Sequence, residues 1–358
     1  MYDFTPLVDS IRNYLNAQFN PGMATALIWA IIILIYLGFY SILGLVLVYA
    51  ERRVCAFFQL RLGPNRVGWQ GTFQTLADAI KLLLKEPVTV NKADKLLFNL
   101  APFIISLAAL MVLSLIPFAP GLQAFDINIG LLFIIAVSSI GVVGILLAGW
   151  SSNNKYALIG AMRSGAQIVS YELSVGLSLL TMVLLTGTLQ LSEIIQSQAD
   201  GWWIFKGHLP AIAAFFLFIT AAIAEINRGP FDLPEAESEL TAGFHTEYSG
   251  LKFAFFFLAE FVNMFTMSAI AATVFFGGWM PLHIGDWHAF NRIMDFIPPF
   301  IWFFVKVGGI IFLMMWFKWT FPRLRIDQLL HLEWKYLMPL NLMNIVIMAI
   351  LVYLGWHF

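Results

Sequence analysis

The chain has 358 residues, of which 60% are hydrophobic and only 11% charged, and its formal net charge is −1. Soluble domains carry about a quarter charged residues, so this composition excludes an ordinary soluble domain and indicates an integral membrane protein. A net charge near zero gives no indication of nucleic-acid binding. The single cysteine, Cys55, can form neither an internal disulfide nor an iron–sulfur cluster.

The first twenty residues place apolar side chains at roughly helical spacing, which predicts an amphipathic segment on the membrane surface. Eight apolar stretches follow, each long enough to cross a bilayer as a helix. They cover residues 23–50, 97–118, 128–150, 166–187, 209–226, 252–277, 298–317 and 336–356. Alternating strand patterns are absent. The sequence therefore predicts an all-α integral membrane protein with about eight transmembrane helices plus amphipathic surface helices, in a single membrane domain over 1–358.

The segment 51–95 is the longest connection between two predicted spans. Its turn-rich part, Arg61–Gly68, lacks the Gly-Lys-Ser/Thr ending of a phosphate-binding loop, so we reject nucleotide binding there. Residues 73–84 have apolar side chains on one helical face and polar side chains, such as Asp78, on the other. This pattern predicts a helix that lies in the membrane interface with its apolar side toward the lipid.

Lysine and arginine predict the orientation of the chain. The loops after the first, third, fifth and seventh spans hold sixteen of the twenty Lys and Arg residues. Because such loops stay on the cytoplasmic side, we expect the N-terminus outside and the segments 51–95 and 227–251 inside.

The stretch 225–252 combines six carboxylates with two cations, between two long apolar runs. The carboxylates are Glu225, Asp232, Glu235, Glu237, Glu239 and Glu247. We expect a short helix to start at Asp232. Crowded carboxylates repel one another, so at least one should keep its proton to an unusually high pH, which suits a protein that moves protons. The alternative is a solvated cytosolic loop.

Four ionisable residues fall within predicted spans: Glu172, Glu225, Glu260 and Lys306. Charge inside a membrane is energetically unfavourable and usually functional. Counted from the predicted span ends, all four lie in the inner half or near the middle of the membrane. This predicts a proton path that enters from the inside and leaves sideways into a partner. The alternative is a structural bridge in which Glu260 or Glu172 pairs with Lys306.

No pair of histidines lies in the middle of two spans, which argues against a cytochrome b. The sequence also shows no cluster, flavin or nucleotide motif, no Ser-His-Asp pattern and no metal site. We therefore expect the chain to carry no redox centre of its own.

Several motifs together resemble one known family. The segment 51–68, ERRVCAFFQLRLGPNRVG, is similar to the signature after the first helix of the quinone-site membrane subunit of respiratory complex I, the H-subunit family of NADH:quinone oxidoreductase. Segments 224–240 and 243–250 resemble its second signature, and 170–174 and 322–329 resemble further family segments. The similarity covers essentially the whole chain in order.

The resemblance implies a membrane subunit of NADH:quinone oxidoreductase. Ubiquinone or menaquinone, as substrate, would enter from the bilayer through a tunnel at the inner surface, and a cluster in neighbouring subunits would reduce it. Quinone reduction would drive proton translocation along buried charges that begin in this chain. The implied partners are the lipid membrane and the iron–sulfur and proton-pumping subunits of complex I. No iron–sulfur cluster, haem, flavin or nucleotide is expected in this chain, and a bacterial plasma membrane is the expected location.

The resemblance also implies roles for individual residues. The quinone-binding candidates are Glu51, Arg52, Arg61 and Asp78 in the entrance segment, Arg228 in the acidic loop, and Arg323 and Arg325 in a basic segment near the same cavity. The proton-path candidates are Glu235, Glu237, Glu239 and Glu247 in the acidic loop, with Glu172, Glu225 and Glu260 inside the membrane. Lys306 is a further proton-path candidate, only because of its position inside a predicted span.

Two other functions remain open at this point. An energy-converting hydrogenase or formate hydrogenlyase has a related membrane subunit that needs no quinone. A stand-alone ion transporter would be a different class, and it would call for internal repeats or broken helices around a midplane site. We find no convincing repeat in the sequence.

Overall fold

The computed structural model describes residues 5–233, 240–283 and 288–356, with residue 7 described by its backbone alone. Within these ranges eight helices are long and apolar enough to cross a membrane, as the sequence predicts. They are α2 (Pro21–Phe58), α4 (Lys95–Ser114), α5 (Gly130–Ser151), α6 (Lys155–Thr186), α9 (His208–Glu225), α11 (Gly250–Phe275), α13 (Pro299–Thr320) and the continuous span α14–α15 (Ile326–Tyr353). The same ranges contain no strand, only one isolated bridge. The prediction of an all-α membrane protein is confirmed.

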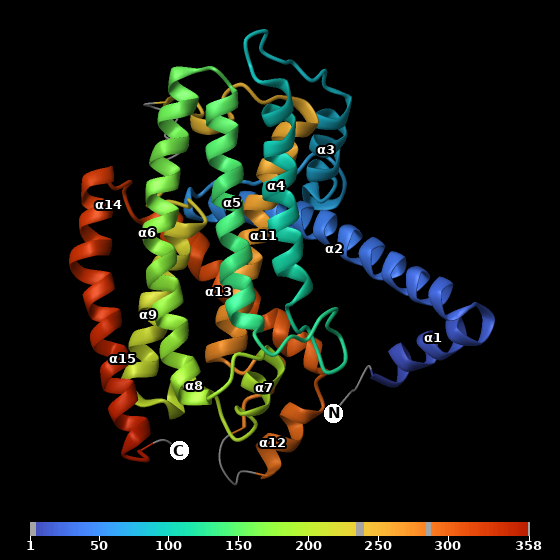
Figure 1. Cartoon of the computed structure of the whole chain (residues 1–358), viewed down its shortest axis with the longest axis vertical. Coiled ribbons are helices and arrows are strands. Elements are labelled where there is room, and N and C mark those ends of the chain that lie inside the picture. Colours follow the sequence, from blue (N-terminus) through green and yellow to red (C-terminus); the bar gives the residue numbers. More distant parts are fainter. Residues whose placement is uncertain (1–4, 234–239, 284–287, 357–358) are drawn as a thin grey trace.

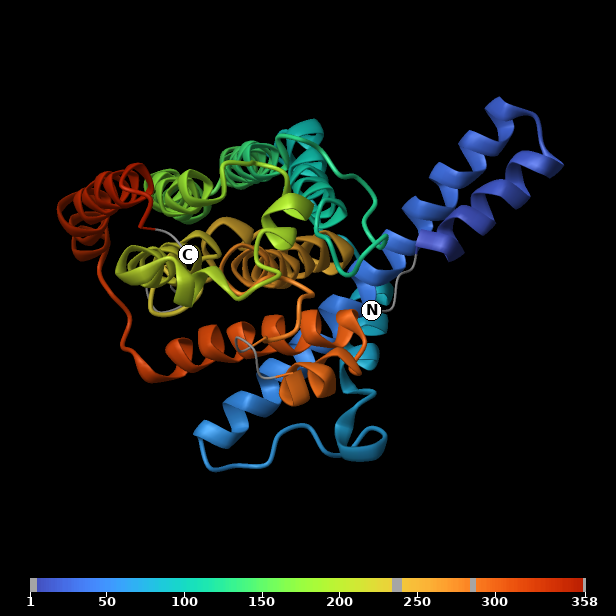
Figure 2. The same cartoon turned by 90° about the horizontal axis from the view of Figure 1, so that it is seen from below.

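The long helices stand in three rows (Figures 1 and 2). Neighbouring pairs in the first row are α15 with α6, α6 with α5, and α5 with α4. The second row holds α9 and α11, which pack on α6 and α4. The third row holds α13 and the end of α2, both against α11. Helix α11 therefore lies at the centre and can present side chains to elements from every part of the chain.

The first part of α2 and the amphipathic helix α1 (Thr5–Gln18) form an arm that projects from the bundle (Figure 2). The sequence places the end of the first span at Glu51, but α2 continues to Phe58. Its 38 residues correspond to roughly 57 Å, about twice the thickness of a hydrocarbon core. The polar residues after position 50 therefore extend the helix past the apolar layer, and they do not end it.

Two further spans begin earlier than their apolar runs. Helix α6 starts at Lys155, where the Asn154 side chain accepts a hydrogen bond from the Tyr156 N–H at 2.9 Å. The last span starts with α14 (Ile326–Leu332) and passes through a π-turn before α15 (Met338–Tyr353). Apolar length alone misses such turns because their polar side chains find partners inside the protein. Ser164, for example, is fully buried and accepts a hydrogen bond from Asn227 Nδ2 at 3.3 Å.

The predicted interfacial helix is present as α3 (Gln74–Leu84), after a 3-10 turn η1 (Trp69–Gly71). Its polar side contacts the chain, whereas Leu76, Ile80 and Leu83 remain exposed. An outward apolar face is the arrangement expected of a helix that rests on lipid.

Small residues bring the connection after α9 close to α6. A Cβ at Gly160 would lie 2.8 Å from the Cα of Gly243, which opens the 3-10 turn η2 (Gly243–His245). No side chain fits there, so η2 packs directly on the α6 backbone. Short helices α7 (Leu191–Gln196), α8 (Trp203–Lys206) and α12 (His288–Asp295) lie at the opposite end of the bundle (Figure 1).

Candidate functional site

Four side chains from four separate segments form a buried charge cluster: Glu51 (α2), Arg228 (after α9), Glu260 (α11) and Lys318 (α13). The Arg228 guanidinium donates to Glu51, and its Nε lies 2.8 Å from Glu260 Oε1. Lys318 Nζ donates to the other Glu51 oxygen at 2.5 Å. Arg228 is only 4% exposed. The cluster therefore joins three helices: Arg228 links α2 to α11, and Glu51 links α2 to α13 through Lys318.

The charge cluster is balanced, with two carboxylates and two cations. Burying a charge is unfavourable unless an opposite charge and good hydrogen bonds compensate it. The Phe261 ring, centred 4.2 Å from the Arg228 guanidinium carbon, adds a cation–π contact. Because Arg228 contacts both carboxylates, a change of charge at Glu51 changes the strength of the Arg228–Glu260 ion pair.

A second ion pair lies beside the charge cluster. Arg323 Nη2 is 2.9 Å from Asp232 Oδ2, and the Leu324 N–H donates to the Pro230 carbonyl at 3.1 Å. These contacts join the segment after α13 to the segment after α9. Burial raises the pKa of the Asp232 carboxyl above its ordinary value, although the Arg323 guanidinium opposes that rise.

The remaining quinone-binding candidates are not brought into the charge cluster. Arg52 pairs with Asp78 of α3, with 2.5 Å between Nη1 and Oδ2, at a polar cleft of about 690 Å³. Arg61 donates to Gln59 at 2.6 Å, and Arg325 is exposed at the start of α14. The seven candidates thus separate into the charge cluster, its neighbour pair, the α2–α3 pair and two arginines that lie apart.

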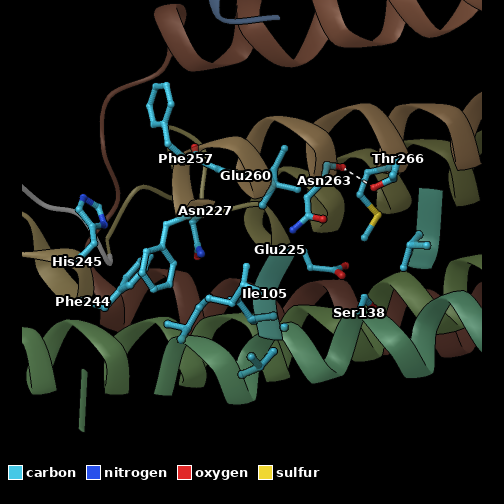
Figure 3. A pocket seen from close by; sticks show the side chains of 18 of the residues that line it. Ile105, Ser138, Glu225, Asn227, Phe244, His245, Phe257, Glu260, Asn263 and Thr266 are labelled. Carbon is cyan, nitrogen blue, oxygen red and sulfur yellow. Dashed lines mark hydrogen bonds between the residues drawn. The ribbon is translucent and has the colours of Figure 1, made fainter. Parts of the chain in front are cut away.

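An internal cavity of about 90 Å³ adjoins the charge cluster. Glu260 lines it together with Glu225, Asn227 and Asn263, and Figure 3 shows Glu225, Asn263 and Glu260 grouped together with Ser138 next to Glu225. The rest of the lining is mostly apolar and aromatic. A volume of this size has room for a few water molecules, and the polar side chains supply partners for them. We name it the glutamate cavity.

Two serines of α5 connect the glutamate cavity to a third glutamate. Ser138 lies at the Glu225 carboxyl, and Ser139 hydrogen-bonds the Glu172 carboxylate of α6. Glu225, the last residue of α9, is buried, and within the described ranges its Oε2 atom has no hydrogen-bond partner. The predicted membrane carboxylates Glu260, Glu225 and Glu172 therefore follow one another from the charge cluster toward α5 and α6.

Known proteins with similar sequences identify the family of this chain. A family profile described as NADH dehydrogenase matches residues 30–349. Proteins named as the H subunit of NADH-quinone oxidoreductase are 58% identical in Bacteroides fragilis and 57% in Phocaeicola vulgatus, in each case over the whole length of both chains. Another from Geobacillus sp. is 46% identical over 96% of this chain and 97% of its own.

The chain belongs to the NADH dehydrogenase family. The resemblance to the H-subunit group, inferred from its motifs, is confirmed. In this family member the first signature supplies Glu51 and the second supplies Arg228, and the structure brings the two side chains into contact across 177 positions of sequence.

Lys306 of this family member lies apart from the three glutamates. It donates three hydrogen bonds to the backbone carbonyls of Phe276, Gly278 and Met280, at 2.5 to 2.9 Å, and lies 4.5 Å from the Trp202 ring centre. Those carbonyls follow the end of α11 at Phe275, and the expected depth of Lys306 near the membrane middle stays a prediction. The alternative, a structural bridge from Lys306 to Glu260 or Glu172, is wrong, because Lys306 binds backbone carbonyls and these carboxylates bind Arg228 and Ser139.

Replacing Lys306 with methionine should lower the amount of assembled chain more than its activity. Three carbonyls would lose their donor, at about 1–3 kcal/mol for each that stays buried and unpaired. Immunoblots of membranes, with quinone reductase rates normalised to assembled chain, measure both effects. Lys155→Met, at an exposed position, is the control. A normal amount of chain with lost activity would instead place Lys306 in the proton path.

The acidic loop is only partly described. Glu247 accepts a hydrogen bond from Asn154 Nδ2 at 2.5 Å, at the start of α6 and outside the glutamate cavity. Glu235, Glu237 and Glu239, and the short helix expected after Asp232, fall in 234–239, outside the described residues.

The sequence reasoning did not assign Lys318, His245 or Asn263 to a site. In the sequence, Lys318 contributes only to the predicted orientation, because nothing in the sequence shows that its side chain meets Glu51. Asn263 follows Glu260 by three positions, so it shares a helical face with that glutamate, and this spacing was an available signal.

His245 lines the glutamate cavity between the rings of Phe244 and Phe253. Burial lowers the pKa of its imidazole from 6.5 to about 4, because the surroundings disfavour the charged ring. The folded state therefore binds fewer protons than the unfolded state between these two values. Stability should consequently fall as the pH is lowered from 6.5 toward 4.

His245→Gln should weaken this pH dependence. The purified complex with unmodified chain should lose more thermal stability between pH 6.5 and pH 5 than the variant, because glutamine does not titrate. Unfolding temperatures from intrinsic fluorescence measure the difference. His331→Gln, an exposed position, is the control. If thermal stability changed equally with pH in all three proteins, His245 would not contribute to the pH dependence, and the prediction would be wrong.

Proposed function

We propose that this chain is the membrane subunit of a proton-translocating NADH:quinone oxidoreductase that helps form the quinone tunnel and couples quinone reduction to proton movement. The contact between the charge cluster and the glutamate cavity carries this proposal. Glu260 belongs to both, so charge at one end of the bundle is linked to carboxylates deep inside it.

The quinone would bind near the connections 51–95 and 227–251. Both lie at one end of the bundle, since Ser249 Oγ accepts a hydrogen bond from the Val88 N–H at 2.9 Å. In this proposal the apolar lipid-facing side of α3 guides the isoprenoid tail. The Arg52–Asp78 pair lines the entrance, and Arg228 and Arg323 face the headgroup region.

Coupling in this proposal is electrostatic. Quinone reduction creates negative charge, or a demand for protons, near the cluster. Arg228 holds Glu51 and Glu260 at once, so a stronger pull on one carboxylate weakens its hold on the other. Glu260 would then take or release a proton through water in the glutamate cavity, followed by Glu225 and Glu172. The proton would leave into a neighbouring subunit.

Electrons would come from partner subunits. NADH oxidation needs a flavin, and electron transfer to quinone needs iron–sulfur clusters. This chain contributes quinone contacts and proton groups in the proposal, and companion subunits hold those cofactors. The chain would be one domain in a bacterial plasma membrane, with its N-terminus outside and the acidic loop in the cytoplasm.

Affinity purification of the tagged chain from its own membranes tests this function. We expect flavin and iron–sulfur subunits to co-purify, and the preparation to oxidise NADH with a quinone acceptor. Co-purification with a hydrogenase, or hydrogen evolution, would favour the energy-converting hydrogenase. Ion transport by the isolated chain in vesicles would contradict a subunit role.

A further inference from the structure

Helix span α14–α15 packs against α6 and α9 (Figure 1). Its packed side carries several buried polar residues. The buried residues of this span after Leu329 are spaced three or four apart, which places them on one face: Glu333, Leu337, Asn341, Asn344 and Met348. Only 22% of the most apolar window of this span is buried inside the chain. Three of the five buried positions are nevertheless polar, which apolar packing against α6 does not require.

Glu333 is the most deeply buried carboxylate of this face, at 1% exposure. One oxygen is hydrogen-bonded to Ser174 Oγ of α6, and the other has no partner within the described residues. No cation of the described chain forms an ion pair with it, and His331 and Lys335 on the same helix are exposed. On α6, Glu333 interacts electrostatically with Tyr171. An ionised carboxylate in such surroundings is strongly disfavoured, so the neutral acid is the form that fits.

The backbone around Glu333 is built in an unusual way. Residues Glu333–Leu337 form a π-turn, in which the Met338 N–H bonds to the Glu333 carbonyl, five residues back. One turn earlier, the Tyr171 hydroxyl donates to the Leu329 carbonyl at 3.0 Å. π-turns inside α-helices are frequent at functional sites. Helix α6 thus binds α14–α15 through Tyr171 and Ser174, on the side that carries Glu333.

Asn341, on the same face, also has buried polar atoms without a hydrogen-bond partner within the described residues. Its side chain is 0% exposed, and neither amide atom has a hydrogen-bond partner within the described residues. Its neighbour Asn344 donates to the Pro210 carbonyl at 3.0 Å. On α6, Ser178 and Thr181 follow Ser174 at helical spacing, and their hydroxyls bond to carbonyls of their own helix. Buried polar atoms that lack protein partners are usually satisfied by internal water.

We propose that Glu333, Ser174 and Asn341 form an internal site for a proton and water between α6 and α15. Glu333 carries an exchangeable proton there, and water bound at its free oxygen and at the Asn341 amide gives that proton access to solvent. Glu172 lies on the other flank of α6, where it bonds to Ser139 of α5, so this site is distinct from the glutamate cavity. The proposal does not depend on which reaction the complex catalyses.

Infrared spectra of the purified complex, with unmodified chain and with Glu333→Gln, test the site. The difference spectrum should show one carbonyl band of a protonated carboxylic acid that is lost in the variant. In the unmodified complex that band should shift after transfer to D2O, because water reaches the group. Glu193→Gln, at an exposed position of α7, is the matched control and should remove no such band.

Two more variants separate a proton and water site from a buried contact between helices. Ser174→Ala should keep the band and move it to higher frequency, since the hydrogen bond to the carboxyl is lost. Asn341→Leu should slow the exchange of the Glu333 carboxyl proton in D2O.

The proposal fails if Glu333→Gln removes no protonated band, because Glu333 is then ionised. It also fails if the band does not exchange, since Glu333 would then only join two helices, or if Asn341→Leu leaves the exchange rate unchanged. If Glu333→Gln does not assemble, the Ser174→Ala shift and the Asn341→Leu exchange rate decide the question.

Discussion

Replacing Arg228 with methionine should abolish quinone reductase activity. The variant leaves Glu260 without its cation and Glu51 with Lys318 alone, although both carboxylates stay in the bundle. Breaking a buried ion pair by removing one partner costs about 3–5 kcal/mol. A loss of about 1.4 kcal/mol is tenfold in an equilibrium constant, so we expect a loss of assembled complex, of activity, or of both, well above tenfold. Membrane quinone reductase rates and immunoblots measure the two effects.

A double variant tests whether the unpaired Glu260 carboxylate causes the loss expected for Arg228→Met. Arg228→Met combined with Glu260→Gln should assemble better than Arg228→Met alone, because the carboxylate that lost its cation is then neutral. Arg292→Met, at an exposed position of α12 at the opposite end of the bundle, is the matched control and should behave like the unmodified chain. Wild-type assembly and activity in Arg228→Met would mean that the charge cluster supports neither the fold nor the reaction.

Replacing Glu225 with glutamine should lower quinone reductase activity by at least about tenfold while the complex still assembles. Glutamine has nearly the same shape and can hydrogen-bond Ser138, so packing at the end of α9 should survive. It cannot take up and release a proton, however, and Glu225 stands between Glu260 and Glu172 in the proposed path. Quinone reductase rates in membranes, proton uptake by inverted vesicles and the amount of assembled complex should be measured together.

The control for this experiment is Glu193→Gln, which changes an exposed carboxylate of α7. Activity and pumping at wild-type levels in Glu225→Gln would remove this residue from the coupling path. Normal activity with reduced pumping would keep the residue in the proton path but separate it from quinone reduction. Failure to assemble would mean that the carboxyl is structural, and Glu225→Asp would then be the variant to compare.

The spans and the interfacial helix could be predicted because hydrophobicity and helical period are local properties of the sequence. The ends of the spans could not be predicted in this way, because Glu51, Ser164 and Glu333 lie outside the apolar runs and contact partners that are distant in sequence. The three membrane glutamates were likewise identifiable from their burial in apolar runs. The partners of Lys306 could not be predicted, because counting residues in one span does not reveal which carbonyls the loop after another span offers.

The amino-acid sequence by itself determined that this protein is an eight-span membrane protein of the H-subunit group with carboxylates inside its apolar runs. Those conclusions follow from the unfavourable transfer of charge into hydrocarbon and from the motifs. Each of these depends only on residues that are close together in the sequence. Only the tertiary structure decided that Arg228 bridges Glu51 and Glu260, that Lys318 joins them, and that Glu260 also faces the glutamate cavity. The physical reason is that an ion pair depends on contact over a few ångströms, and helix packing alone brings residues 51, 228, 260 and 318 within that range.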